Sequence, residues 1–328
     1  MKNSIFKRLV SSVLLSAMCM SVFVGCSAKE QEVVFYSNAD DEAVVSMKAT
    51  LDANGYEGKY IFQSFGTSEL GGKLLAEGTN IEADVITMSS YYVESSQVEH
   101  NMFLDLTFDT NTLDEYPSYY TPFIGNQGAL IINTEEISAL GLDIPESIAD
   151  LADEQYAGVI SVVDITGSST AWLMVQALVD AYGEDETQDI LSGIYENAGA
   201  HLETSGSAPI KKVRAGEVAI GFGLRHQAVA DKEDGLPVDF VDPTEGNFTL
   251  TESLAVVNKG DKTNSLAMEM VQCIIEEGRE SLMENYPVPL YNGETADETA
   301  LSPNSKVFSE PLTVDLLKEH EAISEAAK

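Results

Sequence analysis

The stretch that decides the fold is Glu32-Val33-Val34-Phe35-Tyr36-Ser37, an apolar and aromatic run that small and acidic residues, 38–42, follow at once. The run has the length and composition of a buried β-strand. The residues after it include the Asn and Asp side chains that commonly cap helices. We therefore expect a strand that ends at Ser37 and a helix that runs to about Asn54, before Gly55.

The same succession of strand, small polar turn and helix occurs twice more. Residues 59–63 predict a strand, and the turn Gly66-Thr67-Ser68 precedes a helix that ends near Gly78. Residues 83–88 predict a third strand, which Ser89-Ser90-Tyr91 follow. Strands that alternate with helices are typical of an α/β fold with a parallel sheet. In such sheets ligands bind beyond the carboxyl ends of the strands, where these small polar residues fall.

A second block of the chain repeats this pattern. Residues 159–163 predict a strand, residues 166–170 a turn and residues 171–182 a helix. Residues 218–222 and 251–257 predict two further strands, and the apolar strand 128–133 stands where the chain would cross between two lobes. We therefore expect one lobe of residues 32–128 with 258–328, and a second lobe of residues 129–257. About 300 residues are enough for two lobes of ordinary size.

The N-terminus has the pattern of an export signal. Lys2, Lys7 and Arg8 precede an apolar stretch, 9–24, and a small residue then precedes Cys26. This junction resembles the lipoprotein box of bacteria, so we expect residues 1–25 to be removed as a signal peptide and Cys26 to carry lipid, with 26–31 as a tether. The protein would then be anchored at the extracellular face of the cytoplasmic membrane. The alternatives are an ordinary signal peptide and a membrane anchor. The apolar stretch 9–24 is short for a membrane-spanning helix, which disfavours the anchor.

Charge and cysteine content narrow the function classes. The formal net charge is −36, and the predicted mature chain holds 15 basic and 54 acidic residues. Such a surface repels nucleic acid and anionic lipid headgroups. An anionic ligand would have to be captured by local donors rather than by long-range attraction. After processing only Cys273 remains beside Cys26, and its apolar helical surroundings predict a small buried side chain rather than a reactive thiol.

The order of these elements resembles the extracellular solute-binding proteins of ABC importers, in the subgroup of ferric iron, thiamine and 2-aminoethylphosphonate binders. The resemblance covers nearly the whole mature chain. It rests on the segments 36–37, 66–70, 74–78, 83–85, 128–133, 166–170 and 216–221. It implies a two-lobed type II periplasmic-binding-protein fold with two crossing strands, a hinge motion that closes on the ligand, and an ABC permease and ATPase as partners. It also implies a monomer without catalytic residues or cofactor.

One segment departs from the iron binders of this subgroup. Those proteins resemble one another in an adjacent tyrosine pair after the strand that matches 218–222, where this chain has Gly223-Leu224-Arg225-His226-Gln227. Phenolate oxygens suit a ferric ion, whereas a guanidinium offers forked donors to an oxyanion. We therefore favour a phosphonate, phosphate ester or carboxylate over iron, with 2-aminoethylphosphonate as the best single compound. A metal or sugar-phosphate binder is the alternative within the family.

The candidate ligand-binding residues lie at predicted strand ends and helix starts. Gly167 allows a close backbone approach, and three hydroxyl residues follow it at a helix start, where N–H groups favour anions. The alternatives are simple helix caps for the hydroxyls, a salt bridge for Arg225 and a solvated surface position for His226. The full set is Ser37, Asn38, Thr67, Ser68, Ser89, Ser90, Tyr91, Thr166, Gly167, Ser168, Ser169, Thr170, Arg225, His226 and Asp242.

A secreted hydrolase and a surface adhesin are the alternatives from other function classes. A secreted hydrolase needs a nucleophile or metal motif, and the sequence contains neither Gly-x-Ser-x-Gly nor His-Glu-x-x-His. The histidines show no metal-ligand spacing, so no metal site is predicted. A surface adhesin on the same fold stays open, because binding residues alone do not distinguish it from an importer component.

Overall fold

The computed structural model describes residues 31–296 and 300–328. Residues 33–328 form one compact unit. The predicted signal peptide and the predicted lipid site at Cys26 lie outside the described residues. Within the described part of the chain, no helix is both long enough and apolar enough to cross a membrane.

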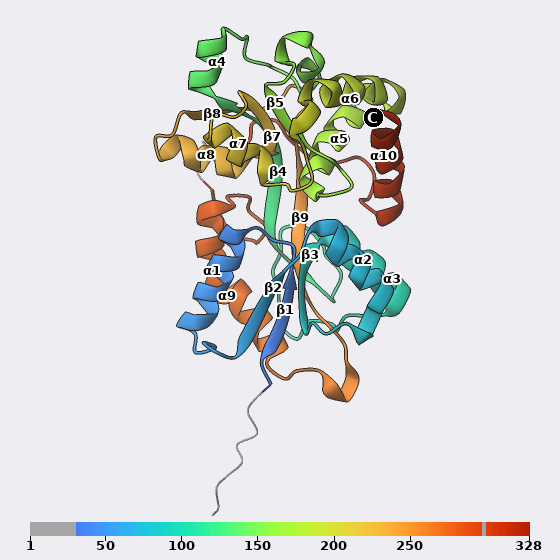
Figure 1. Cartoon of the computed structure of the whole chain (residues 1–328). Coiled ribbons are helices and arrows are strands. Elements are labelled where there is room, and N and C mark those ends of the chain that lie inside the picture. Colours follow the sequence, from blue (N-terminus) through green and yellow to red (C-terminus); the bar gives the residue numbers. More distant parts are fainter. Residues whose placement is uncertain (1–30, 297–299) are drawn as a thin grey trace, which may run out of the picture. The chain divides into compact units, whose positions relative to one another are not determined.

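The described residues contain ten strands in one sheet, in the order β2-β1-β3-β9-β4-β7-β5-β6, with β8 beside β4 and β10 beside β9 (Figure 1). Their bounds are β1 Val33–Ser37, β2 Tyr60–Ser64, β3 Val85–Ser89, β4 Thr121–Asn133, β5 Ile160–Val163, β6 Leu202–Glu203, β7 Ile220–Leu224, β8 Val238–Val241, β9 Asn247–Val256 and β10 Ser305–Lys306.

The first three strands form the parallel part of the first lobe. β1 pairs in parallel with β2 on one side and with β3 on the other, in the register Phe35↔Phe62 and Phe35↔Val85. Phe35 is fully buried, and its ring stacks on Phe62 with centroids 4.4 Å apart. β1 and β3 are buried along nearly their whole length, which explains why apolar runs of the sequence predicted them well.

β4 and β9 are long strands that run through both lobes (Figure 1). The first half of β4 pairs antiparallel with β9, from Thr121↔Leu254 to Gln127↔Thr249. Its second half pairs with β7 and β8. β9 also pairs with β3 on its other edge. These two strands therefore connect the strands of the first lobe with β5, β6 and β7 of the second.

Helices cover the sheet on both faces. The α-helices are α1 Asp41–Ala53, α2 Thr67–Glu77, α3 Ser90–His100, α4 Thr134–Leu140, α5 Ser169–Tyr182, α6 Glu184–Ala198, α7 Ala208–Arg214, α8 Arg225–Glu233, α9 Ala267–Asn285 and α10 Val314–Ala326. Short 3-10 turns are η1 Gly78–Asn80, η2 Ala149–Ala152, η3 Glu154–Tyr156, η4 Gly199–His201 and η5 Gly260–Lys262.

The C-terminal region packs in two places. α9 packs against α1, and its buried face includes Met270, Ile274 and Cys273. α10 instead contacts α5, α6 and α3. There the indole Nε1 of Trp172 on α5 donates to Nδ1 of His320 on α10, at 2.8 Å. The lobe boundaries drawn from the sequence stay a prediction, because α10 reaches helices from both of the predicted segments.

Candidate functional site

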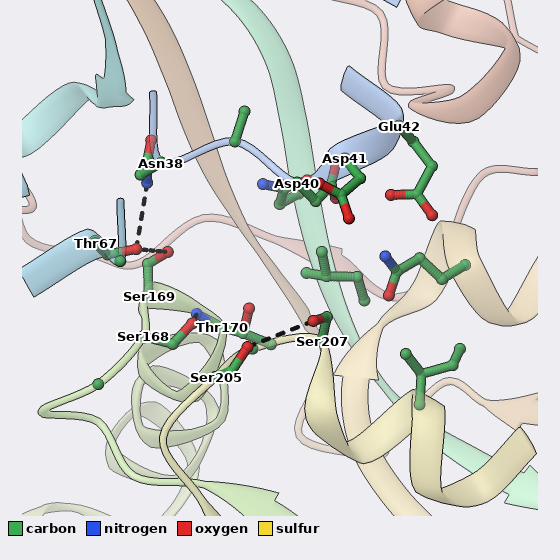
Figure 2. Close-up of a pocket in the computed structure, with 18 of the residues that line it drawn as sticks. Asn38, Asp40, Asp41, Glu42, Thr67, Ser168, Ser169, Thr170, Ser205 and Ser207 are labelled. Carbon is green, nitrogen blue, oxygen red and sulfur yellow. Dashed lines mark hydrogen bonds between the residues drawn. The ribbon is translucent and has the colours of Figure 1, made fainter. Parts of the chain in front are cut away.

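A cavity of about 310 Å³ opens between the carboxyl ends of β1 and β2 and the start of α5 (Figure 2). Polar and small residues from both lobes form its wall. They are Asn38, Ala39, Asp40, Asp41, Glu42, Phe65, Gly66, Thr67, Asn126, Gly167, Ser168, Ser169, Thr170, Thr204, Ser205, Gly206, Ser207, Ile210, Lys211, Arg214, Leu224, Gln227 and Glu252.

The N-terminus of α5 forms one side of the cavity. The hydroxyl of Ser168 caps this helix by accepting from the backbone N–H of Thr170 at 3.2 Å. Ser169 and Thr170 are the first two residues of α5, and the helix does not require their hydroxyls as caps. Their hydroxyls and the backbone N–H of Ser169 therefore lie beside the positive end of the helix dipole, whereas the N–H groups of Thr170 and Ala171 are bonded to Ser168.

Two glycines let the backbone close around this helix start. A Cβ at Gly167 would come within 2.4 Å of the carbonyl oxygen of Thr204. A Cβ at Gly206 would come within 2.4 Å of the Thr170 hydroxyl and 2.6 Å of the Ser168 hydroxyl. The loop 204–207 can therefore lie against the start of α5 only because both positions lack a side chain.

The N-terminus of α2 faces the same cavity from the first lobe. Its N-cap residue is Gly66, which offers no side-chain acceptor to the first-turn N–H groups. The Thr67 hydroxyl lies 3.3 Å from Asn38 Nδ2 and 3.5 Å from the Ser169 hydroxyl (Figure 2). Next to Thr67, Ser68 donates to the carbonyl of Thr166 at 2.6 Å. These contacts join the two lobes across the cavity, with two helix N-termini pointing at one space.

Oxygen acceptors without partners lie at the base of the cavity. Glu252 on β9 is 2% exposed, and its Oε1 accepts from Ser89 at 2.8 Å and from Asn38 at 3.4 Å. Its Oε2 has no partner, and neither have the side-chain oxygens of Asn38, Asn126 and Gln227. Burial raises the pKa of Glu252 to about 7, although the hydrogen bonds from Ser89 and Asn38 lower it.

Acidic residues and basic residues occupy different parts of the wall. Asp40, Asp41 and Glu42 group at the start of α1 (Figure 2). Asp40 caps α1 through Ala43 N–H at 3.2 Å and also accepts from the Tyr286 hydroxyl, and burial raises its pKa. On α7, Lys211 contributes positive charge to the wall, whereas the guanidinium of Arg214 is paired with Asp231, with Nε 2.6 Å from Oδ2.

Several of the predicted ligand residues come together in this cavity, and they come from both lobes. Asn38, Thr67, Gly167, Ser168, Ser169 and Thr170 are part of its wall. Ser68 and Thr166 are not part of the wall; they contact each other next to the wall residues Thr67 and Gly167. Their role toward a ligand stays a prediction.

Four other predicted residues lie behind the wall. Ser37 is buried and accepts from the Thr87 hydroxyl at 2.6 Å, and Ser90 contacts the hydroxyls of Thr251 and Ser253. Tyr91 is buried against Trp172, with ring centroids 4.8 Å apart. Ser89 reaches the cavity only through its bond to Glu252.

Arg225 and Asp242 form an ion pair with each other. Arg225 is the first residue of α8, is 3% exposed and is not part of the cavity wall. The structure thus favours the salt-bridge alternative for this side chain. His226 packs on Tyr286, with ring centroids 4.4 Å apart, and burial lowers its pKa to about 4. It is not a solvated surface side chain.

The sequence-based set omitted Asn126, Gln227 and Glu252. Glu252 had a signal, because it is an acid in the middle of the strand sequence Leu250-Thr251-Glu252-Ser253-Leu254. A charged residue in a buried strand needs a partner or a function. The described residues contain no group of three or more His, Cys, Asp or Glu side chains suited to hold a metal ion.

Comparison with known proteins agrees with this architecture. The model of a family described as bacterial extracellular solute-binding protein matches residues 87–308. A protein of Haemophilus influenzae, described as uncharacterized, is 24% identical over 310 residues, which cover 90% of this chain and 88% of the other.

Solved structures show the same fold at low sequence identity. The periplasmic binding protein AfuA from Actinobacillus pleuropneumoniae, with fructose-6-phosphate bound, is 22% identical and has a TM-score of 0.70 over 90% of this chain and 95% of that one. Iron-bound HitA from Pseudomonas aeruginosa is 21% identical, with a TM-score of 0.68 over 90% and 99%. These likenesses confirm the predicted two-lobed α/β fold of type II periplasmic binding proteins.

Proposed function

Because this chain belongs to the family of bacterial extracellular solute-binding proteins, we propose that its cavity captures a small anionic or zwitterionic solute for an ABC importer. The best single candidate is 2-aminoethylphosphonate. We further propose that the protein works as a lipid-anchored monomer outside the cytoplasm, with Cys26 as the lipid site, and that it releases its solute chemically unchanged.

The observation that carries the proposal is the meeting of two helix N-termini, those of α2 and α5, at one cavity. Each helix start presents N–H donors and hydroxyls to the same space, from opposite lobes. An oxyanion satisfies several such donors at once and gains from both helix dipoles. Lobe closure would then be stabilised by the ligand itself, because its oxygens bridge donors that belong to different lobes.

The overall charge requires this kind of local capture. A protein with a formal net charge of −36 repels anions at long range. Screening limits that repulsion to about 8 Å at physiological salt. Within the cavity, the donors of Ser169 and Thr170 and the positive side chain of Lys211 act at shorter range than this, whereas the charge of Arg214 is paired with Asp231.

A sugar phosphate is the second candidate. It shares the phosphate chemistry, it has hydroxyls for a wall that is rich in polar side chains, and a fructose-6-phosphate complex is known for the similar fold of AfuA. The ferric alternative has less support, because tyrosine and histidine are absent from the described residues that form the cavity wall.

Isothermal titration calorimetry tests the proposal. The purified protein would be titrated with 2-aminoethylphosphonate, inorganic phosphate, fructose 6-phosphate and thiamine, and ferric citrate would be tested by metal analysis. We expect saturable one-to-one binding of 2-aminoethylphosphonate, with no product detectable by phosphorus NMR after prolonged incubation. Failure of every phosphorus compound to bind would refute the proposal, and release of phosphate would favour a hydrolase instead.

A further inference from the structure

We propose that Glu252, together with Asn126 and Gln227, forms a subsite that binds a protonated amine of the solute. This inference rests on the proposed function, because it assigns the second end of a ligand whose first end is an oxyanion at the α5 N-terminus. It commits the cavity to amine-bearing phosphonates, phosphate esters or carboxylates rather than to simple anions.

The first support is the set of buried acceptors without partners. Glu252 is 2% exposed and Gln227 is 5% exposed, and both contribute to the cavity wall. Glu252 Oε2, Gln227 Oε1 and Asn126 Oδ1 have no hydrogen-bond partner. Buried polar atoms are nearly always paired in folded proteins, so a concentration of unpaired oxygens at one cavity indicates a ligand that supplies donors.

The second support is the chemical identity of these atoms. An ionised carboxylate has acceptors only, and here Ser89 and Asn38 already donate to Oε1. Glu252 Oε2, Gln227 Oε1 and Asn126 Oδ1 stay without a hydrogen-bond donor. A ligand that satisfies them has to offer several N–H or O–H groups. An ammonium group has three donors and no acceptor, whereas a hydroxyl brings one donor together with lone pairs of its own.

The third support is electrostatic. Burial disfavours the charged form of Glu252, and the nearby Asp40 disfavours it further. No Lys or Arg in the described residues forms an ion pair with Glu252, although the wall holds Lys211 and Arg214 elsewhere. A cation placed against Oε2 would therefore supply the positive charge that this carboxylate lacks, and charge-assisted hydrogen bonds are the strong ones.

The spacing of the two subsites fits a compact ligand. Contacts of 3.5, 3.3 and 3.4 Å lead from Ser169 Oγ through Thr67 and Asn38 to Glu252 Oε1. These two atoms are therefore at most about 10 Å apart, so a ligand that contacts both of them, with each of its groups about 3 Å from its wall atom, has to be compact. The ligand then carries its two charged groups only a few bonds apart.

Calorimetry with three matched compounds tests the assignment: 2-aminoethylphosphonate, 2-hydroxyethylphosphonate and ethylphosphonate. For the natural protein we expect the amine compound to bind at least tenfold more tightly than either of the others. Glu252→Gln is expected to remove that preference by lowering affinity for the amine compound at least tenfold, and to leave ethylphosphonate within threefold. Glu57→Gln removes the same charge at an exposed position that is not part of the cavity wall, and it is expected to change every affinity by less than threefold.

Each outcome is decisive. If ethylphosphonate binds as tightly as the amine compound, or if Glu252→Gln weakens both equally, the amine subsite is refuted while anion capture stands. If the hydroxyl compound equals the amine compound, the subsite binds hydroxyls and the inference is wrong. If none of the three compounds binds to a protein that thermal unfolding shows to be folded, the proposed function fails and this inference fails with it.

Discussion

The guanidinium of Arg225 holds the carboxylate of Asp242 in a two-pronged ion pair, with Nε 2.7 Å from Oδ1 and Nη2 3.1 Å from Oδ2. The guanidinium also lies over the ring of Phe240, with 4.6 Å from Cζ to the ring centroid, and Nη1 donates to the carbonyl of Ala300. Asn247 donates to Asp242 Oδ1 at 2.9 Å. Each of the three nitrogens of this buried side chain thus donates to an oxygen of the protein itself.

Replacement of Arg225 is therefore expected to affect stability more than ligand affinity. Arg225→Gln leaves the Asp242 carboxylate buried without its partner, which costs about 3 kcal/mol or more of the free energy of unfolding. Urea unfolding measures this loss, and calorimetry on the folded fraction should show affinity within threefold of the natural protein. Unchanged stability together with lost binding would instead show that the guanidinium contacts the ligand.

Ser168 and Ser169 provide a matched pair at the start of α5. Ser168→Ala removes the helix cap and is expected to lower the free energy of unfolding by about 1 kcal/mol. Ser169→Ala removes a hydroxyl that faces Thr67 at 3.5 Å and is expected to leave stability within about 0.5 kcal/mol. If the cavity binds as proposed, Ser169→Ala lowers solute affinity several-fold. Equal stability losses in the two variants would contradict this separation of roles.

The sequence predicted the elements whose burial is continuous. β1, β3 and β5 are buried along nearly their whole length, so apolar runs marked them. β4 begins at Thr121, seven residues before the predicted strand, because Gly125, Asn126 and Gln127 interrupt the apolar pattern. Asn126 belongs to the cavity wall and Gln127 is buried, so polar residues inside this strand concealed its first half from periodicity.

The candidate site divides in the same way. The sequence predicted helix-start residues of the cavity wall such as Thr67 and Ser169, because a turn before a helix has a local sequence signal. Glu252 and Gln227 were not found, since each comes to the cavity through contacts distant in sequence: Glu252 bonds Asn38, which is 214 residues away. The pairing of Arg225 with Asp242 likewise depends on how α8 lies beside β8, which no local pattern records.

Glu252 is expected to make the ligand-free protein less stable as the pH rises. Its pKa is about 7 in the folded protein against an ordinary value of 4.5, so the folded state holds the proton more tightly than the unfolded state. The contribution of Glu252 to the free energy of unfolding is complete below pH 4.5. It is lost as the pH rises toward 7, and the loss is at most about 3 kcal/mol.

Glu252→Gln isolates that contribution, because glutamine keeps the shape and cannot ionise. The free energy of unfolding in urea, measured without ligand at pH 5 and pH 8, should fall less in the variant than in the natural protein. Glu42→Gln, at an exposed position, should follow the natural protein at both values. A difference between Glu252→Gln and the natural protein that does not change with pH would contradict the expectation.

A fall in pH is expected to weaken the contact between α5 and α10, because this contact includes the buried His320. His320 is 1% exposed, and burial lowers its pKa to about 4 from an ordinary 6.5. Its neutral Nδ1 accepts from the indole of Trp172, the single tryptophan of the chain. As the pH falls, the unfolded state therefore takes up the proton before the folded state does. The contribution of His320 to the free energy of unfolding is complete above pH 6.5 and is lost as the pH falls toward 4, by at most about 3 kcal/mol.

His320→Gln keeps an acceptor for Trp172 and removes the titration. Urea unfolding followed by tryptophan fluorescence at pH 7 and pH 4.5 should show a smaller acid-induced loss in this variant than in the natural protein. His201→Gln, which changes a half-buried histidine away from α10, should lose as much as the natural protein. Because buried His226 has a pKa of about 4 as well, His320→Gln retains part of the acid sensitivity. Identical losses in His320→Gln and the natural protein would show that His320 does not resist protonation in the folded state.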